Sequence, residues 1–190
     1  MSFVADWLTP KATDLGKRYD AFYTICDQLE QLGRPVTIVE TGCVRMEHNW
    51  SGDGQSTVVW DQLAQHVGGR VLSVDLDPHA AALAHSLTSD LTTVECNDSV
   101  AWLLHLATLG LEADFLYLDS YDIDWGNPEP SMRHHMKEIE AAAPMLRPGS
   151  IVAVDDNQPD AGKGYLVGQY AEQHGWTELH DSYVRAWVVS

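Results

Sequence analysis

Basic residues are scarce in this sequence, and their scarcity limits the partners of the protein. Lys and Arg together number 11 against 28 Asp and Glu, which gives a formal net charge of −17 over 190 residues. A surface that binds nucleic acid or anionic lipid needs cationic side chains to meet the phosphates. The sequence therefore argues against nucleic-acid and membrane partners.

Long hydrophobic runs and paired cysteines are also missing. No stretch reaches the roughly 20 apolar residues that span a bilayer, and residues 1–7 lack the basic flank and apolar core of a secretion signal. The three cysteines are widely spaced without a C-x-x-C pattern, so they indicate neither a disulfide framework nor a thiolate zinc site. We expect a cytoplasmic protein.

The run 36–42 gives the clearest strand pattern in the chain. Its β-branched residues carry no charge for four positions, which is typical of a strand buried on both faces of a parallel sheet. Glu40 then lies near the carboxyl end of the strand, where ligands bind in open α/β sheets, and Gly42 allows a sharp turn. We predict that a ligand binds beside Glu40 and Gly42.

Strand and helix patterns alternate along the whole chain, and its length suits one domain with a substantial core. This alternation predicts an α/β, Rossmann-like, doubly wound and mostly parallel seven-stranded sheet with helices on both faces. Residues 1–35 would form a helical cover and 36–190 the core. The last two strands are joined by only two residues, so they must form an antiparallel hairpin. The predicted strands are 36–42, 71–75, 91–95, 114–119, 151–157, 177–180 and 183–189, and the predicted helices are 13–32, 56–67, 79–87, 100–109, 131–145 and 164–174.

Acids end four of the predicted parallel strands. Right-handed crossovers bring the carboxyl ends of such strands to one edge, where like charges repel unless a cation or a hydrogen-bonding ligand offsets them. Asp75, at the end of the second strand, is placed to bind ribose hydroxyls, which indicates a ligand that contains a nucleoside. No contiguous G-x-G-x-x-G motif is present, so the long loop does not pack its glycines for a pyrophosphate. The absence of a G-x-x-x-x-G-K-[ST] phosphate loop argues against a nucleoside triphosphatase. The acids are Glu40, Asp75, Asp119 and the pair Asp155 and Asp156.

A series of short motifs in chain order resembles the class I S-adenosylmethionine-dependent methyltransferases. The series is Glu40-Thr41-Gly42, Ser56-Thr57, Asp75, Asn97-Asp98-Ser99, Leu118-Asp119 and the Leu-Arg-Pro-Gly-Ser of 146–150. With the final hairpin, the resemblance covers residues 36–190. It implies S-adenosylmethionine as the cofactor and Asp75 as the ligand of its ribose. The other residues that it places around the cofactor are Glu40, Thr41, Gly42, Ser56, Thr57, Asp98, Ser99 and Asp119. Loop 43–55 is longer than the usual turn of the family, so its role stays open.

The acids after the fourth and fifth strands are similar to those of metal-dependent O-methyltransferases of the catechol-like and the sugar or macrolide types. The resemblance implies that Asp119 and Asp156, with Asp155 or Asn157 as the third ligand, hold Mg²⁺ or another hard divalent cation, which would bind an acceptor hydroxyl and lower its pKa. The catechol-like enzymes carry a lysine soon after the first of these acids, whereas this chain has Ser120-Tyr121-Asp122. We therefore take Asp122 and His134 as candidate bases beside Asp119.

The sequence thus predicts methyl transfer from S-adenosylmethionine to a hydroxyl of a small molecule or glycosyl unit, assisted by a divalent cation. Two alternatives stay open. One is a metal-free transfer to nitrogen, carbon or a carboxylate, and the other is a non-catalytic module that binds a nucleoside or a partner protein. The sequence identifies neither the acceptor nor the oligomeric state, and a homo-oligomer is among the open choices.

Overall fold

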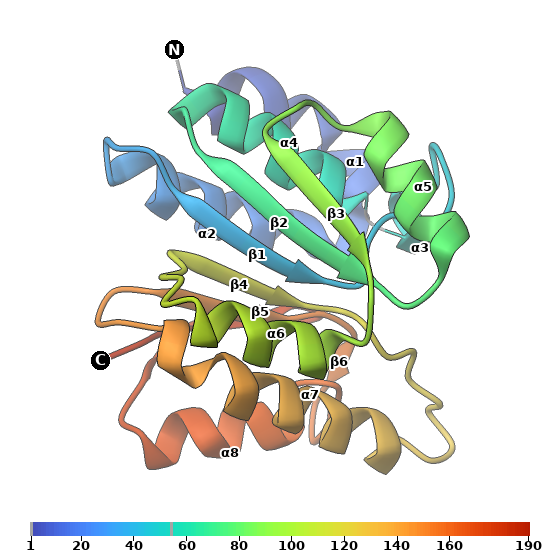
Figure 1. The fold of residues 1–190 in the computed structure, drawn as a ribbon, viewed down its shortest axis with the longest axis vertical. Coiled ribbons are helices and arrows are strands. Elements are labelled where there is room, and N and C mark those ends of the chain that lie inside the picture. Colours follow the sequence, from blue (N-terminus) through green and yellow to red (C-terminus); the bar gives the residue numbers. More distant parts are fainter. Residues whose placement is uncertain (1, 54) are drawn as a thin grey trace.

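A single sheet organises the protein, which is described by a computed structural model for residues 2–53 and 55–190 (Figure 1). The strand order is β3-β2-β1-β4-β5-β9-β8, with β1 at the centre of the parallel part and β9 antiparallel to both β5 and β8. This topology confirms the predicted Rossmann-like, mostly parallel sheet with a closing antiparallel hairpin. The strands are β1 Thr37–Thr41, β2 Arg70–Asp75, β3 Thr92–Cys96, β4 Phe115–Leu118, β5 Ile151–Val154, β8 Thr177–Asp181 and β9 Arg185–Val188.

Helices cover both faces of the sheet. Two of them, α2 and α4, lie behind the sheet in Figure 1, whereas α6, α7 and α8 lie in front of it. Helix α5 packs against β2, β3 and α4 at the sheet edge. These helices are α2 Tyr19–Gln31, α4 Ser56–Val67, α5 Pro78–Leu87, α6 Ser99–Thr108, α7 Glu129–Ala142 and α8 Tyr165–Gln173.

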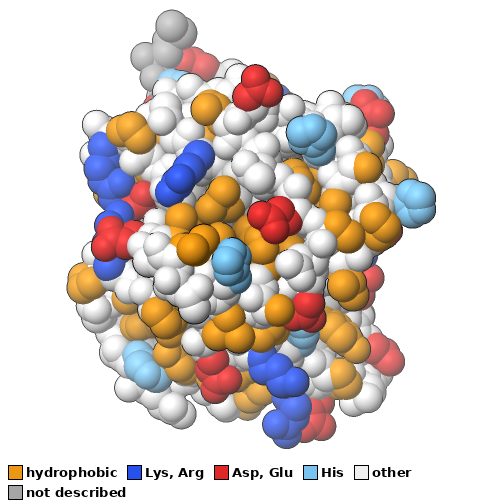
Figure 2. All heavy atoms as spheres, viewed as in Figure 1, with side chains coloured by type: hydrophobic (Ala, Val, Ile, Leu, Met, Phe, Trp, Pro, Cys, Tyr) orange, Lys and Arg blue, Asp and Glu red, His pale blue; other side chains and the backbone are white. Residues whose placement is uncertain are grey.

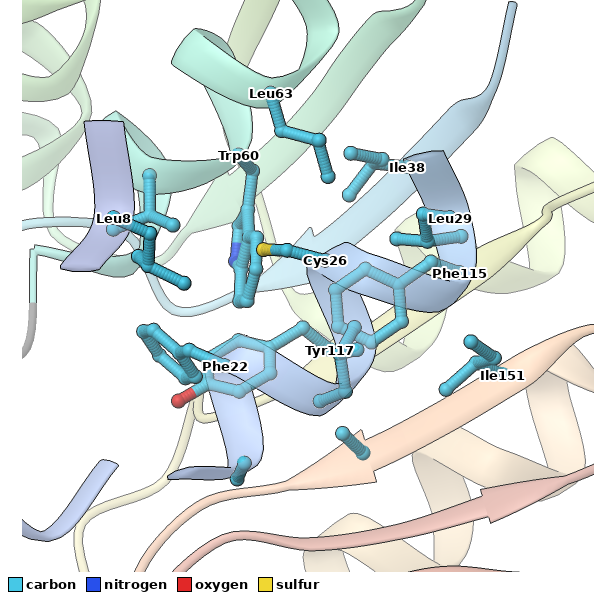
Figure 3. Close-up of a cluster of buried hydrophobic side chains, with 14 of the residues drawn as sticks. Leu8, Phe22, Cys26, Leu29, Ile38, Trp60, Leu63, Phe115, Tyr117 and Ile151 are labelled. Atoms are coloured by element: carbon cyan, nitrogen blue, oxygen red, sulfur yellow. The ribbon is translucent and has the colours of Figure 1, made fainter. Parts of the chain in front are cut away.

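The hydrophobic core is divided by the sheet because successive strand residues point to opposite faces. Ile38 packs into the cluster under α2 and α4, and Val39 packs into the cluster under α6, α7 and α8. Figure 3 shows the first cluster, in which Trp60 lies among aromatic rings. Its centroid is 4.7 Å from that of Phe22 and 4.9 Å from that of Phe115. Both faces are therefore buried, as the charge-free run 36–39 predicts.

Three local predictions were wrong in detail. The predicted helix 13–32 is interrupted at Gly16, whose φ of +52° ends α1 (Ala12–Leu15) before a 3₁₀ turn leads into α2. The predicted strand 151–157 ends at Val154 because Asp156 takes a φ of +54°, and the chain then forms a small hairpin of β6 (Asn157–Gln158) and β7 (Ala161–Gly162). Loop 43–55 contains a short helix, α3 (Trp50–Asp53). The last of these segments contributes Cys43, Arg45 and Asp53 to the candidate site described below.

The surface carries its charges in a mixed pattern. Figure 2 shows Lys and Arg side chains in separate places on the face that it presents, with acidic and hydrophobic side chains between them. No helix within the described residues is both long and apolar enough to cross a bilayer.

Candidate active site

The turn after β1 is the point on which the site is built. Gly42 follows the strand with a φ of +79°, and its N–H donates to the carbonyl of Val74 at 2.8 Å. On the other side, the N–H of Asp119 donates to the carbonyl of Thr41 at 2.8 Å. A Cβ at position 42 would lie 2.4 Å from the carbonyl oxygen of Asp119. Glycine is therefore required for the ends of β1, β2 and β4 to meet.

Two adjoining cavities open at this edge of the sheet. The larger has a volume of about 360 Å³ and the smaller about 70 Å³, and they share Asp75, Leu76 and Ser120. The larger falls within the usual size range of small-molecule sites. Its other lining residues are Gly42, Cys43, Arg45, Asp53, Ser56, Asp77 and Asp119, and the smaller cavity adds Val74, Asp98, Ser99, Tyr121 and His134.

Asp75 lies where the two cavities meet, at the last position of β2. One carboxylate oxygen accepts from the N–H of Cys43 at 3.1 Å, and the other accepts from the N–H of Asp77 at 2.8 Å. Oδ1 keeps a second lone pair, and the only further donor to Oδ2 in the described part of the chain is the thiol of Cys43 at 3.7 Å, which is a weak donor, so the carboxylate can still accept from a ligand. The backbone thus fixes an acceptor pair suited to two neighbouring hydroxyls, such as those of a ribose.

Glu40 supports the cavity wall and does not line it. Its carboxylate is fully buried and accepts from the hydroxyls of Ser56 and Ser73, both at 2.7 Å. Thr41 and Thr57 are also buried behind the lining, and the Thr57 hydroxyl accepts from the N–H of Val44 at 3.0 Å. Of the residues predicted to bind the cofactor, Glu40, Thr41 and Thr57 thus lie outside both cavities. Gly42, Ser56, Asp75, Asp98, Ser99 and Asp119 line them.

The buried carboxyl of Glu40 makes stability depend on pH. Burial raises its pKa from 4.5 to about 7, although the hydrogen bonds from Ser73 and Ser56 oppose the shift. Between these values the unfolded chain holds fewer protons than the folded protein, so folding loses stability as pH rises. A shift of this size corresponds to about 3 kcal/mol.

As the pH rises from 4.5 to 7.5, the stability of the Glu40→Gln variant relative to the wild type should increase by about 2–3 kcal/mol. The wild type loses stability over this range as the buried carboxyl ionises, whereas the amide stays neutral. Urea unfolding of both proteins at each pH measures the difference. Glu140→Gln, at an exposed position of α7, serves as the matched control and should show no such trend. A difference that stays constant with pH for Glu40→Gln would contradict the prediction.

The smaller cavity is lined by polar side chains from three elements. Asp98 caps α6 by accepting from the N–H of Ala101 at 2.9 Å, and the Ser99 hydroxyl lies 3.0 Å from Nε2 of His134. The ring of Tyr121 lies 5.2 Å from that of His134. Beneath them, Glu138 is buried and accepts from the hydroxyl of Ser120 at 2.6 Å. This arrangement offers a flat aromatic side and hydrogen-bonding groups for a nucleobase.

Asp119 and Asp156 meet across a buried lysine. The Nζ of Lys163, a residue that is 1% exposed, contacts a carboxylate oxygen of Asp119 and lies 2.9 Å from Oδ2 of Asp156. Burial alone would lower the pKa of Lys163, but the two carboxylates outweigh it and raise the pKa. Burial also raises the pKa of Asp119 well above its ordinary range, and Lys163 only partly offsets this. The ammonium ion is therefore held between two acids.

The other two predicted metal ligands are engaged elsewhere. Oδ2 of Asp155 lies 2.6 Å from Nε of Arg18, and the carbonyl oxygen of the Asn157 side chain accepts from the N–H of Gly164 at 2.9 Å. Among residues 2–53 and 55–190, no three His, Cys, Asp or Glu side chains are grouped so as to hold a metal ion. The four residues do not fit a Mg²⁺ site as arranged, because the ammonium group of Lys163 lies between Asp119 and Asp156, and the side chains of Asp155 and Asn157 are paired with Arg18 and Gly164.

The candidate bases are placed differently from one another. Asp122 has a side chain that is 71% exposed and pairs with Arg45 at 2.8 Å, whereas His134 lines only the smaller cavity. Asp119 alone among the three lines the larger cavity. Sequence reasoning misses Lys163 because the family resemblance points to a lysine soon after Asp119, whereas Lys163 lies 44 residues further along the chain. A usable signal was its place as one of only four lysines, between two glycines.

Comparisons with known proteins agree with this geometry. A family model described as a methyltransferase domain (Methyltransf_24) matches residues 51–157. No curated protein sequence matches the chain.

Solved structures give the fold match. The MycE methyltransferase of mycinamycin biosynthesis, in complex with Mg and SAH, superposes with a TM-score of 0.66 at 15% identity over 98% of this chain and 53% of that one. The O-methyltransferase NovP gives 0.60 at 14% identity over 92% and 80%. CalS11, a TDP-rhamnose 3′-O-methyltransferase, gives 0.59 at 16% identity over 98% and 90%. The chain thus spans about half the length of MycE.

The sheet order and the cavities at its carboxyl edge define a class I S-adenosylmethionine-dependent methyltransferase fold. Because the family model matches more than half of its residues, the chain belongs to the methyltransferase-domain family (Methyltransf_24).

Proposed function

We propose that this protein transfers a methyl group from S-adenosylmethionine to a hydroxyl of a small molecule or glycosyl unit, with residues 1–190 acting as one domain. The observation that carries the proposal is the pair of cavities joined at Asp75, with Asp119 in the wall of the larger one. The neighbours support a hydroxyl acceptor, since NovP is an O-methyltransferase and CalS11 acts on TDP-rhamnose.

The lining residues fit the cofactor part by part. The carboxylate of Asp75 would hold the ribose hydroxyls, and the smaller cavity, with Ser99, Tyr121 and His134, would hold the adenine. Ser56 and the backbone at Gly42 would bound the methionine end in the larger cavity. The bound cofactor supplies an electrophilic methyl group on a sulfonium.

Asp119 is the group of this chain best placed to assist the transfer. A hydroxyl held in the larger cavity must lose its proton as its oxygen gains the methyl group. A carboxylate oxygen of Asp119 takes that proton, since Asp119 lines the larger cavity. Asp122 and His134 keep other roles in this scheme, at the exposed ion pair with Arg45 and at the adenine side.

We expect Asp75→Ala to weaken cofactor binding about 100-fold, since two hydrogen bonds to a charged acceptor are lost. Calorimetric titration of S-adenosylmethionine into wild type and variant measures the change. Asp90→Ala, at an exposed acid between α5 and β3, is the matched control and should bind like the wild type. Circular dichroism confirms that the Asp75 variant is folded.

The outcome also tests the function as a whole. Equal affinities for wild type and Asp75→Ala would remove Asp75 from the site. No binding of S-adenosylmethionine by the wild type would overturn the proposed methyl transfer. Formation of a methylated product from a panel of sugars and phenols would establish the hydroxyl acceptor and exclude a non-catalytic module.

The sequence predicts a divalent cation in this reaction, but the contacts between side chains of this chain argue against one. Its support is the Mg present in the MycE complexes. Against it stands Lys163, which already contacts both Asp119 and Asp156. The position of this lysine favours the metal-free form of the reaction.

A further inference from the structure

Lys163 is a buried cation at the place where the sequence predicts a metal. Its side chain is 1% exposed, and its ammonium group lies between Asp119 and Asp156. Burying a charge is costly unless partners offset it, and here two carboxylates do so. The same two carboxylates are the ligands that a divalent cation at this edge of the sheet would need.

The backbone around Lys163 is fixed by the hairpin of β6 and β7. A Cβ at Gly162 would lie 2.6 Å from Cα of Asn157, and one at Gly164 would lie 2.8 Å from its Oδ1. The N–H of Lys163 donates to the carbonyl of Asp156 at 3.2 Å. Glycines on both sides thus let the hairpin close on Asn157, which places the backbone of Lys163 beside Asp156. Asn157 acts here as a support for Lys163.

Ion pairs and a hydrogen bond within the chain already engage the acids around Lys163. The cluster holds three carboxylates (Asp119, Asp155 and Asp156) and two cations (Lys163 and Arg18), and the hydroxyl of Tyr183 also donates to Asp156. Mg²⁺ requires near-octahedral oxygen coordination at about 2.0–2.1 Å. To bind here it would have to expel the ammonium group from a buried position.

We propose that Lys163 is the resident cation of this site, standing in for a divalent metal between Asp119 and Asp156, so that methyl transfer by this chain is metal-independent. The statement about methyl transfer rests on the proposed function. The statement that Lys163 fills the cation position does not depend on it. Lys163 acts through Asp119, whose carboxylate it holds in the wall of the larger cavity. It is a positioning residue.

Metal binding by the protein itself tests the proposal. The wild-type protein is first freed of metal with EDTA and then titrated with Mn²⁺ by calorimetry. We expect no binding of Mn²⁺ to be detected at concentrations up to the millimolar range. Lys163→Ala removes the ammonium and leaves two facing carboxylates, so it should bind Mn²⁺ at least about tenfold more tightly and melt at a higher temperature when Mn²⁺ is present. Lys163→Arg keeps a cation and should behave as the wild type. Lys137→Ala, at an exposed lysine of α7, should do so too.

The outcomes separate this inference from the proposed function. Tight Mn²⁺ binding by the wild type would overturn the inference, as would a Lys163→Ala variant that gains none. If Lys163→Ala does not fold, Lys163→Met replaces it in the titration, because it also lacks the ammonium group but keeps the side-chain volume. The titration of the wild type still tests whether the site binds Mn²⁺. Where an acceptor is found, turnover unchanged by EDTA supports the inference, and turnover lost to EDTA and restored by Mg²⁺ contradicts it. Failure to find any acceptor would count against the proposed function alone, since the Mn²⁺ titrations need no acceptor.

Discussion

Gly42→Ala is expected to lower the free energy of unfolding by about 2–6 kcal/mol. Two costs add at this position. An L-residue at a φ of +79° costs about 1–3 kcal/mol. The new Cβ would also lie 2.4 Å from the backbone oxygen of Asp119, and forcing extra atoms into a packed region costs about 1–3 kcal/mol more. For a protein of this size, the melting temperature should fall by roughly 10 °C.

Gly110→Ala is the control that separates these two costs. Gly110 has a φ of +71°, but a Cβ there would have no atom within 4 Å. It should therefore cost only the strain, about 1–3 kcal/mol. Urea unfolding and calorimetric melting of the two variants measure both values. Equal losses for the two variants would show that close approach to Asp119 contributes nothing at Gly42.

The turn at Gly42 also shows what local sequence can predict. The charge-free run 36–39 predicts a strand buried on both faces, and Gly42 predicts a sharp turn after it. A few adjacent residues therefore predict both features. Asp75 follows from the same reasoning because β2 pairs with β1 in register, Thr41 beside Val74. The fold, and the position of Gly42 and Asp75 at the edge of the sheet where the larger cavity opens, could therefore be predicted before any contact was known.

The cation cluster could not be predicted in the same way. Arg18 and Asp155 are 137 residues apart, and Lys163 reaches Asp119 across 44 residues. Neither pairing has a periodic pattern, because each depends on how a turn redirects the chain. Gly16 breaks the predicted helix just before Arg18, and the left-handed Asp156 ends β5 just before the Lys163 hairpin. The acids alone resemble a metal site, and only their long-range partners show which cations they hold.

Loop 43–55 illustrates an intermediate case. The sequence shows that the loop is long, but it does not show the contacts that the loop makes within itself. The carboxylate of Asp53 accepts from the N–H of Arg45 at 2.9 Å, and the side chain of Gln55 donates to the carbonyl of Met46 at 2.7 Å. Trp50 packs near Trp7 of the N-terminal segment, with 6.4 Å between ring centroids. The loop thus forms a wall of the larger cavity, tied both to itself and to the first turns of the chain.

Arg18 joins this loop to Asp155, which follows β5. Replacing Arg18 should lower the free energy of unfolding by about as much as replacing Gly42. The guanidinium lies 2.6 Å from Asp155 and donates to the carbonyl of Gly52 at 3.2 Å, with both ionic side chains almost fully buried. Arg18→Met keeps an apolar stem of similar length but leaves Asp155 buried without its partner. Removing one member of a buried ion pair costs about 3–5 kcal/mol. We expect a fall of roughly 10 °C in the melting temperature.

The double variant Arg18→Met with Asp155→Asn distinguishes an ion-pair effect from lost packing. Asparagine can still accept from the N–H of Asp156, as Oδ1 of Asp155 does at 2.8 Å, but it carries no charge that needs a partner. The double variant should therefore be more stable than Arg18→Met alone, with a coupling energy of about 1–3 kcal/mol in a double-mutant cycle measured by urea unfolding. Additive losses would mean that Arg18 contributes through its contacts with the loop, and that Asp155 tolerates burial without it. A positive coupling would show that Asp155, one of the predicted metal ligands, is neutralised by Arg18 from the N-terminal segment of the same chain.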